Sequence, residues 1–267
     1  LSTLTRADID DVVIVHSPEA KKEFENNIQT ETKITYAEQH EALGTAHAVK
    51  TALPHVSTDN FLVLLGDVPL LSESSVMKIK EELERHKLVI LTAHVKDPTG
   101  YGRISKDKDG KPSAIIEELD CNDEQKKIKE INSGIMAFNT EIAKSLIEKI
   151  EPNPKKNEYY LTDAIEIAYH EGIGATTHST SEEEVFGVNS KKDLAEAEKI
   201  NRNKIASDLM DAGVTIIDPE RIDVRGTLTC GKDVTIDVST VFIGDVTLSD
   251  GVTVGPFTVI ANSEIGE

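Results

Sequence analysis

A carboxylate, Asp67, directly follows a short apolar run and a glycine. The run at residues 61–65 has the length and composition of a strand that is buried on both faces, as in a parallel sheet. A carboxylate at the carboxyl end of such a strand lies where open α/β sheets bind ligands, and Gly66 leaves room for a phosphate or a base. The alternative is an ordinary Gly-Asp turn, and these two residues alone do not decide between the two interpretations.

A second candidate anion site lies at Gly44 and Thr45, which precede a predicted helix. Free amide groups at the beginning of a helix can hold an anion. The chain as a whole is acidic, because 29 Lys and Arg against 48 Asp and Glu give a formal net charge of −19. This charge argues against non-specific binding to nucleic acid or anionic membranes. An anionic substrate would therefore need local positive charge or a divalent cation.

The two cysteines, Cys121 and Cys230, show neither a pairing pattern nor metal-ligand spacing. Two such thiols are typical of a reducing compartment, so we predict a cytoplasmic protein. No apolar run approaches the length that a membrane span needs. The 267 residues suffice for one large domain or two smaller ones.

Strands and helices alternate in the segments that must position these residues. The predicted strands lie at residues 12–15, 34–37, 61–65 and 87–95, and helices begin at Ser17, Gly44 and Ser72. Such alternation indicates a parallel or mixed α/β sheet. Farther along, the pattern predicts a hairpin with its tip at 106–111, a strand at 130–138, and helices at 140–150 and 161–171.

A six-residue repeat occupies the C-terminal part, after a polar helix predicted at residues 191–212. The repeated apolar residues are Val224, Cys230, Ile236, Phe242, Leu248, Val254 and Ile260. This period is typical of short parallel strands that stack into a β-helix, with the apolar residue of each hexad inside. Because no capping repeat precedes Glu267, we expect further coils beyond it, and complete coils of this kind commonly trimerise.

Six runs of residues resemble, in the same order, one enzyme family. They are ALGTAHA at 42–48, LGDVPL at 65–70, DPTGYGRI at 97–104, EINSG at 130–134, NEYYLTD at 157–163 and GVN at 187–189. With the polar helix and the hexads, they resemble the bacterial bifunctional enzymes that combine N-acetylglucosamine-1-phosphate uridyltransferase and glucosamine-1-phosphate acetyltransferase activities. The resemblance implies an α/β, Rossmann-like nucleotidyltransferase domain at 1–190, N-terminally incomplete, a linker helix at 191–212 and the start of a left-handed parallel β-helix at 213–267.

The resemblance also implies a reaction and a set of site residues. The reaction is uridylyl transfer from UTP to N-acetylglucosamine-1-phosphate, giving UDP-N-acetylglucosamine and pyrophosphate. The parent enzyme also acetylates glucosamine-1-phosphate from acetyl-CoA, and is expected to be a homotrimer when its β-helix is complete. The site residues implied are Asp67 and Asn189 for Mg²⁺, Gln39, Gly44, Thr45, Gly66 and Asp67 for the nucleotide, and Gly102, Glu117, Asn132, Tyr160 and Thr162 for the sugar.

Mg²⁺ suits this reaction because two polyanions must be brought together, and a divalent cation neutralises their negative charge. The family's glycine-rich phosphate loop should precede residue 1, and its acetyl-CoA site should lie beyond Glu267. We therefore expect this chain to be an internal segment that lacks acetyltransferase activity and is severely impaired in uridylyl transfer. For Arg103, a phosphate ligand and a structural salt bridge are equally good predictions.

Two alternatives to this function remain open. The chain could be another sugar-1-phosphate nucleotidylyltransferase, with a different sugar or base. It could also be a noncatalytic trimeric scaffold or regulatory subunit with the same fold.

Overall fold

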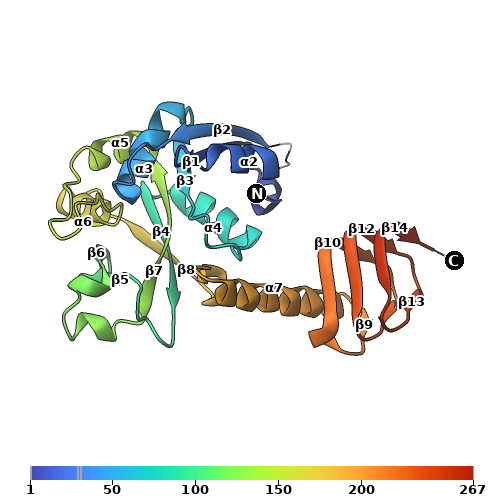
Figure 1. Cartoon of the computed structure of the whole chain (residues 1–267). Helices are drawn as coiled ribbons and strands as arrows, with labels where there is room; N and C mark the ends of the chain where they lie inside the picture. Colours follow the sequence, from blue (N-terminus) through green and yellow to red (C-terminus); the bar gives the residue numbers. More distant parts are fainter. Residues whose placement is uncertain (1, 29, 31, 267) are drawn as a thin grey trace. The chain divides into compact units, whose positions relative to one another are not determined.

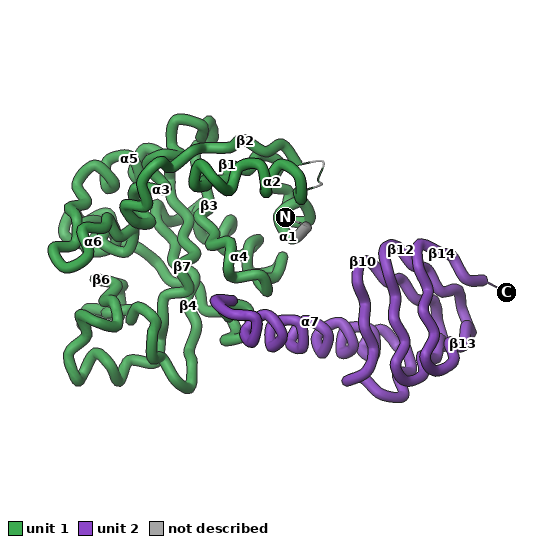
Figure 2. Tube along the Cα trace, viewed as in Figure 1, with its two compact units in different colours: residues 1–186 green, residues 187–267 purple. Residues whose placement is uncertain are grey.

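The computed structural model describes residues 2–28, 30 and 32–266, and the chain folds into two compact units. Residues 1–186 form the first unit and residues 187–267 the second (Figures 1 and 2). Each unit has hydrophobic core residues of its own. Among the described residues, no helix combines the length and the apolar character that a membrane span needs.

A mixed sheet of six strands organises the first unit (Figure 1). The strands are β3 (Asn60–Val63), β4 (Leu88–His94), β5 (Arg103–Lys106), β6 (Pro112–Ile116), β7 (Glu130–Asn139) and β8 (Thr176–Thr180). β7 pairs antiparallel with β4 along one edge, while β3 and β5 pair antiparallel with its other edge. β6 extends the sheet beyond β5, and β8 pairs parallel with β4. The predicted mixed α/β sheet is confirmed.

Helices cover both faces of this sheet. They are α3 (Thr45–Ala52), α4 (Glu73–Leu83), α5 (Thr140–Ile147) and α6 (Asp163–His170). Successive residues of a strand point to opposite faces. Leu88 and Ile90 of β4 accordingly pack with residues of α3, α5 and α6, whereas Val89 and Leu91 pack with residues of α4. β4 is therefore buried on both faces.

The structure corrects the prediction made for residues 61–65. β3 ends at Val63, it pairs antiparallel with β7, and Phe61, Leu62 and Val63 are only partly buried. The neighbouring strands β1 (Asp11–His16) and β2 (Lys33–Glu38) pair with each other in a separate parallel sheet. Among the described residues, β3 has a strand partner on one edge only, which explains why solvent reaches it.

Smaller differences concern the helices and one strand. The helix predicted from Ser17 begins later, as α2 (Lys21–Asn27), because residues 17–20 form a turn in which Ala20 N donates to Ser17 O at 3.1 Å. The short helix α1 (Ser2–Arg6) and the strand β8 were not predicted. Both cysteines are free thiols, as their sequence context indicated.

The second unit begins with the long helix α7 (Lys191–Asp211), which Ser190 caps by accepting a hydrogen bond from Asp193 N. Two parallel sheets follow, made of β9 (Thr215–Ile216), β11 (Thr235–Ile236) and β13 (Thr253–Val254), and of β10 (Ile222–Cys230), β12 (Thr240–Leu248) and β14 (Val259–Ile265). Ile222 pairs with Thr240, and Val241 with Val259, so equivalent residues are 18 positions apart, or three hexads.

The hexad residues face the interior of these coils, as the repeat predicted. Ile236, Phe242, Leu248 and Val254 are fully buried in one core cluster. Residues with positive φ also recur at the same interval of 18, in three series: Gly226, Gly244 and Asn262; Asp233 and Gly251; Ser239 and Phe257. Each coil thus bends at three corners, which is the geometry of a triangular β-helix.

Candidate substrate-binding site

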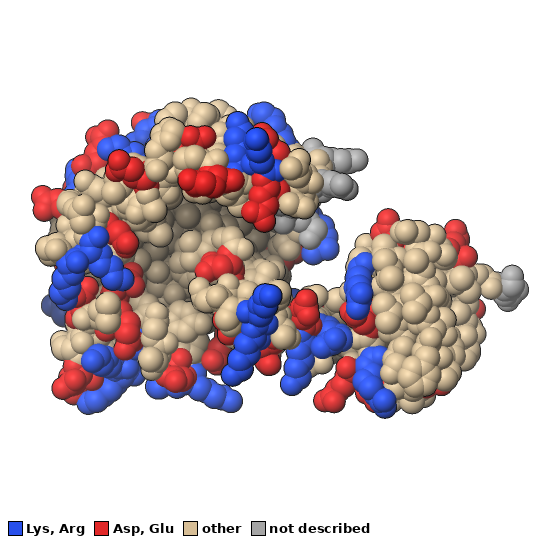
Figure 3. All heavy atoms as spheres, viewed as in Figure 1, with Lys and Arg blue, Asp and Glu red and all other residues tan. Residues whose placement is uncertain are grey.

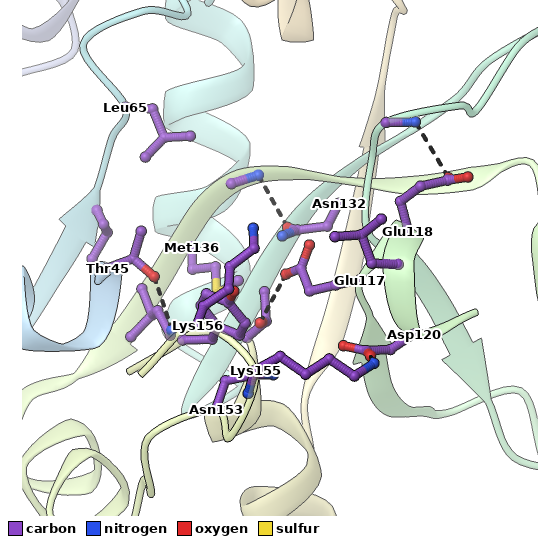
Figure 4. A pocket seen from close by; sticks show the side chains of 17 residues that line it. Thr45, Leu65, Glu117, Glu118, Asp120, Asn132, Met136, Asn153, Lys155 and Lys156 are labelled. Carbon is purple, nitrogen blue, oxygen red and sulfur yellow. Dashed lines mark hydrogen bonds and ion pairs between the residues drawn. The ribbon is translucent and has the colours of Figure 1, made fainter. Parts of the chain in front are cut away.

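A cavity of about 540 Å³ lies in the first unit and is built from segments that are far apart in the sequence (Figure 4). Its walls come from the beginning of α3, the end of β3, the middle of β7, the loop after β6 and the loop before α6. This volume is typical of small-molecule sites. Figure 3 shows the first unit hollowed on one face, with acidic and basic side chains around the hollow.

Five of the residues predicted for the nucleotide or the sugar line this cavity together. They are Thr45, Glu117, Asn132, Tyr160 and Thr162. Gly102 lies directly behind them, because a Cβ at this position would be 2.9 Å from Ile115 Cγ2, 3.5 Å from Glu117 Oε2 and 3.7 Å from Asn132 Cβ. A side chain at position 102 would thus push against the wall that Glu117 and Asn132 form.

The backbone joins the loop before α3 to the loop before α6. Tyr159 N donates to Leu43 O at 2.7 Å, and Ala46 N donates to Tyr159 O at 2.9 Å. Gly44, between these two bonds, has φ +101° and ψ 176°. A Cβ on Gly44 would lie 2.5 Å from Tyr159 O, so the contact requires glycine both for its conformation and for space.

Thr45 adds a side-chain contact to the same junction. Its Oγ1 accepts a hydrogen bond from Leu161 N at 2.9 Å. The segment predicted to contact the nucleotide and the segment predicted to contact the sugar are therefore parts of one hydrogen-bonded structure.

Glu117, Thr162 and Asn132 form the polar wall of the cavity. Thr162 Oγ1 donates to Glu117 Oε1 at 3.0 Å, which orients the carboxylate. Asn132 is fixed on β7 by its own N–H, which donates to Gly102 O at 2.8 Å, and its Oδ1 accepts from Gly134 N at 3.1 Å. Neither Glu117 Oε2 nor Asn132 Nδ2 has a hydrogen-bond partner in the part of the chain that the structure describes. The wall thus offers one free acceptor and one free donor group to a ligand.

Arg103 has a structural role at this site. Its side chain is 1% exposed, Nη2 lies 2.6 Å from Glu118 Oε2, and Nη1 donates to the carbonyl of Tyr101. The hydrogen bond from Arg103 also lowers the pKa of Glu118. Of the two predictions made for Arg103, the structure therefore favours the salt bridge.

Asp163 begins α6 directly behind the polar wall. Burial, together with the negative charges of Glu166, Glu117 and Asp120, raises the pKa of Asp163 to about 6. A carboxyl group in this position thus gains or loses its charge in a pH range where most carboxylates are ionised.

The remaining predicted nucleotide residues lie outside the cavity lining. Gln39 follows β2, and its Nε2 lies 2.8 Å from His47 Nδ1 and donates to Gly44 O at 3.4 Å. Gly66 and Asp67 are exposed in the turn after β3, and a Cβ at Gly66 would meet nothing within 4 Å. The backbone of this turn is thus open to a ligand.

The residues predicted to bind Mg²⁺ supply oxygen atoms, which this ion prefers. The Asp67 carboxylate is exposed and forms no hydrogen bond or ion pair with the described residues. Asn189 belongs to the second unit, where its N–H donates to Asp193 Oδ2 at 3.1 Å, so its pairing with Asp67 stays a prediction. Within the described ranges no group of three or more His, Cys, Asp or Glu could hold a metal. A site with one carboxylate fits Mg²⁺ that is held mainly by substrate phosphates.

Sequence reasoning missed the basic residues of the cavity. Lys155 and Lys156 line it from the loop before α6, and Lys155 Nζ pairs with Asp120 Oδ1. Leu119, 73% exposed, also lines the cavity. The sequence did contain one signal for their role: the two lysines directly precede the run at 157–163, which was predicted to contact the sugar.

Comparisons with known proteins agree with this architecture. The family described as nucleotidyl transferase matches residues 1–198. The bifunctional protein GlmU of Ralstonia pickettii is 46% identical over 234 residues, which are 87% of this chain and 51% of that protein. The bifunctional protein GlmU of Paraburkholderia phytofirmans is 43% identical over 257 residues, which are 96% of this chain and 56% of that protein. The chain thus spans about half the length of the curated relatives that it matches.

A solved structure with the same fold is a Bacillus anthracis protein assigned as a glucose-1-phosphate thymidylyltransferase, in complex with sucrose. The two chains superpose with a TM-score of 0.60 and 21% identity, over 75% of this chain and 79% of the other. At this level of identity the likeness shows the fold alone.

Proposed function

Because the chain belongs to the nucleotidyl transferase family, we propose that its first unit transfers a uridylyl group from UTP to N-acetylglucosamine-1-phosphate. The products are UDP-N-acetylglucosamine and pyrophosphate. The observation that carries this proposal is the cavity, which brings together residues from four separate segments. They are Thr45, predicted to contact the nucleotide, and Glu117, Asn132, Tyr160 and Thr162, predicted to contact the sugar. Relatives that are 43–46% identical over most of the chain are bifunctional GlmU proteins.

The free polar atoms of the cavity wall suit an N-acetylated sugar. Asn132 Nδ2 can donate to the acetamido carbonyl, and Glu117 Oε2 can accept from a sugar hydroxyl. Thr162 holds the Glu117 carboxylate in place through its 3.0 Å hydrogen bond. A fixed acceptor loses less conformational entropy when the sugar binds, so Thr162 contributes to affinity by positioning Glu117.

In the proposed reaction, a phosphate oxygen of the sugar phosphate attacks the α-phosphorus of UTP, and the bond to the leaving pyrophosphate breaks. The attacking oxygen is already ionised, so the step needs no general base, and we assign no catalytic side chain. Asp67 and Asn189 are the proposed protein ligands of Mg²⁺, and the bound ion would neutralise charge on the phosphates. Gln39, Gly44, Thr45 and Gly66 are the proposed nucleotide contacts.

For the second unit, the proposal concerns the whole protein and not this chain alone. The acetylation of glucosamine-1-phosphate from acetyl-CoA, the assembly of a homotrimer through a complete β-helix, and a cytoplasmic location are proposed for the whole protein. No residue of this chain is assigned to the acetyl transfer.

The test of the sugar assignment is the substitution Asn132→Ala. It should weaken the binding of N-acetylglucosamine-1-phosphate by about tenfold and leave the binding of UTP nearly unchanged, because one hydrogen bond in a buried site contributes about 1–1.5 kcal/mol. Both affinities are measured by calorimetry in the presence of Mg²⁺. Asn26→Ala, an exposed position on α2, is the matched control and should change neither affinity. A larger loss for UTP than for the sugar phosphate would contradict the assignment.

Two further measurements separate this function from the alternatives. Asp67→Asn should lower any Mg²⁺-dependent release of pyrophosphate by orders of magnitude without unfolding the protein; unchanged turnover would remove Asp67 from the site. Glucose-1-phosphate should compete poorly with N-acetylglucosamine-1-phosphate, since it has no acetamido group for Asn132. Equal competition would favour a nucleotidylyltransferase for a different sugar.

A further inference from the structure

We infer that Lys156 binds the phosphate group of the sugar phosphate and makes the cavity selective for phosphorylated over neutral sugars. This inference rests on the proposed function and assigns a specificity-determining residue within the same site. It follows from the charges that line the cavity, from the direction of the Lys156 side chain, and from the loop that presents it.

Among the described residues, the charges around the cavity are paired in a way that leaves one ammonium, on Lys156, and one carboxylate, on Glu117, without an ion-pair partner. Three acidic residues and two lysines line it. Glu118 is paired with Arg103 at 2.6 Å, and Asp120 is paired with Lys155. The Lys156 ammonium forms no hydrogen bond or ion pair with any residue that the structure describes. In a chain with a net charge of −19, this ammonium is a positive charge of the cavity lining that no described carboxylate neutralises, so it can pair with an anion.

The side chain of Lys156 points into the cavity, between Leu65 and Asn132 (Figure 4). Asn132 lies where the sugar is proposed to bind, whereas Leu65 leads directly into Gly66 and Asp67, where the metal and the nucleotide are proposed to bind. A sugar-1-phosphate that spans these two regions carries its phosphate between them. A lysine ammonium, with its three donors on a flexible stem, can follow such a phosphate.

The loop that carries Lys156 is ordered by its own hydrogen bonds. Asn153 Oδ1 accepts from Lys155 N at 2.9 Å, and Asn153 O accepts from Asn157 N at 2.8 Å. The ion pair between Lys155 and Asp120 then ties this loop to the loop after β6, which also lines the cavity. The two neighbouring lysines thus differ in their contacts: Lys155 connects the two loops, and Lys156 is left to face a ligand.

The test compares the binding of two ligands, N-acetylglucosamine-1-phosphate and N-acetylglucosamine, by calorimetry on the whole chain with Mg²⁺ present. Lys156→Gln should lower the affinity for the phosphorylated sugar by about tenfold to a hundredfold, the usual effect of losing a hydrogen bond to a charged group, and leave the affinity for the neutral sugar unchanged. Lys156→Arg keeps the charge and should restore most of the affinity. Added salt should shrink the difference between the wild type and Lys156→Gln.

Lys108→Gln is the matched control, because it removes the same charge from an exposed hairpin position outside the cavity lining. It should change neither affinity. The inference is overturned if Lys156→Gln keeps the wild-type preference for the phosphorylated sugar, or if it weakens both ligands by the same factor. In either case the proposed function stands as long as the wild type binds N-acetylglucosamine-1-phosphate. A wild type that binds neither ligand would overturn the proposed function and this inference together.

Discussion

Replacing Gly44 with alanine should destabilise the first unit by about 4 kcal/mol. Gly44 has φ +101° and ψ 176°, a conformation that is essentially restricted to glycine and costs other residues about 1–3 kcal/mol. The added methyl group would also lie 2.5 Å from Tyr159 O and 2.8 Å from Tyr159 N. These backbone atoms are held by hydrogen bonds to Leu43 and Ala46, so relief of the clash costs about 1–3 kcal/mol more, as in other overpacked sites.

The tyrosines allow this effect to be measured on the first unit alone. The chain has five tyrosines and no tryptophan, and the tyrosines are Tyr36, Tyr101, Tyr159, Tyr160 and Tyr169, all before residue 187. Tyrosine fluorescence during urea unfolding therefore follows the first unit. With an m-value of about 2 kcal/mol per M, a loss of about 4 kcal/mol should lower the midpoint by about 2 M urea.

Gly174→Ala provides the control for backbone strain without a clash. Gly174 has φ +71°, but a Cβ there would meet nothing within 4 Å. Its replacement should cost only the left-handed conformation, about 1–2 kcal/mol. If Gly44→Ala destabilises the first unit no more than Gly174→Ala does, the close contact between Gly44 and Tyr159 is refuted, and with it the junction of the two loops.

Two other predictions concern pH and the second unit. Because the pKa of Asp163 is raised from 3.8 to about 6, the folded state holds this proton more tightly than the unfolded state, so the free energy of unfolding should fall as the pH rises from about 4 to about 6. A pKa shift of about two units changes the free energy of unfolding by at most about 3 kcal/mol. Solvent screening of this partly exposed carboxyl group reduces that change to about 1–2 kcal/mol. Asp163→Asn should remove this dependence from tyrosine-monitored urea curves at pH 4 and pH 7; an unchanged pH dependence would contradict the assignment. Phe242→Ala, at a position 1% exposed in the β-helix core, should cost about 3–5 kcal/mol. The loss should be visible in the circular dichroism of the second unit's unfolding and absent from the tyrosine signal, and a shifted tyrosine midpoint would show that the two cores are not separate.

The β-helix could be predicted from the sequence because its repeat is short: the apolar residues that define it are only six positions apart. One inward-facing residue in each hexad is enough to show the period, and Phe242 and Leu248 are buried as the spacing requires. Burial of the strand before Asp67 could not be predicted in this way. Whether a strand is covered on both faces depends on partners that are distant in the sequence, and here β4 lies inside the sheet while β3 has one described partner, β7.

The strand β8 was missed for a related reason. Its residues, Thr176–Thr180, are polar or small, so no apolar run marks them. They form a strand because β4 offers an edge for parallel pairing, from Val89 with Thr176 to Ala93 with Thr180. Tertiary pairing, and not the local pattern, decides the structure of this segment.

Much of the candidate site could be predicted because its residues occur in short runs that resemble one family. Glu117, Asn132 and Thr162 meet in the cavity as the resemblance implied. Lys156 could not be predicted, since a lysine in a polar loop is usually a solvated residue. Its significance depends on Lys155, whose pairing with Asp120 is visible only in the folded chain.

The junction between the two loops affects how any mutation at this site should be interpreted. Gly44 is required by the carbonyl of Tyr159, and Thr45 accepts the hydrogen bond of Leu161 N, so both residues hold the fold together whether or not they touch a nucleotide. Loss of activity on their replacement would therefore not identify a nucleotide contact. Lys156 differs, because its ammonium has no partner among the described residues, and Asn132 differs in part, because its Nδ2 has no partner there although its Oδ1 accepts from Gly134 N. An effect of their replacement on ligand affinity, with the urea midpoint unchanged, can come only from the ligand, and these two positions are the ones that can decide what the cavity binds.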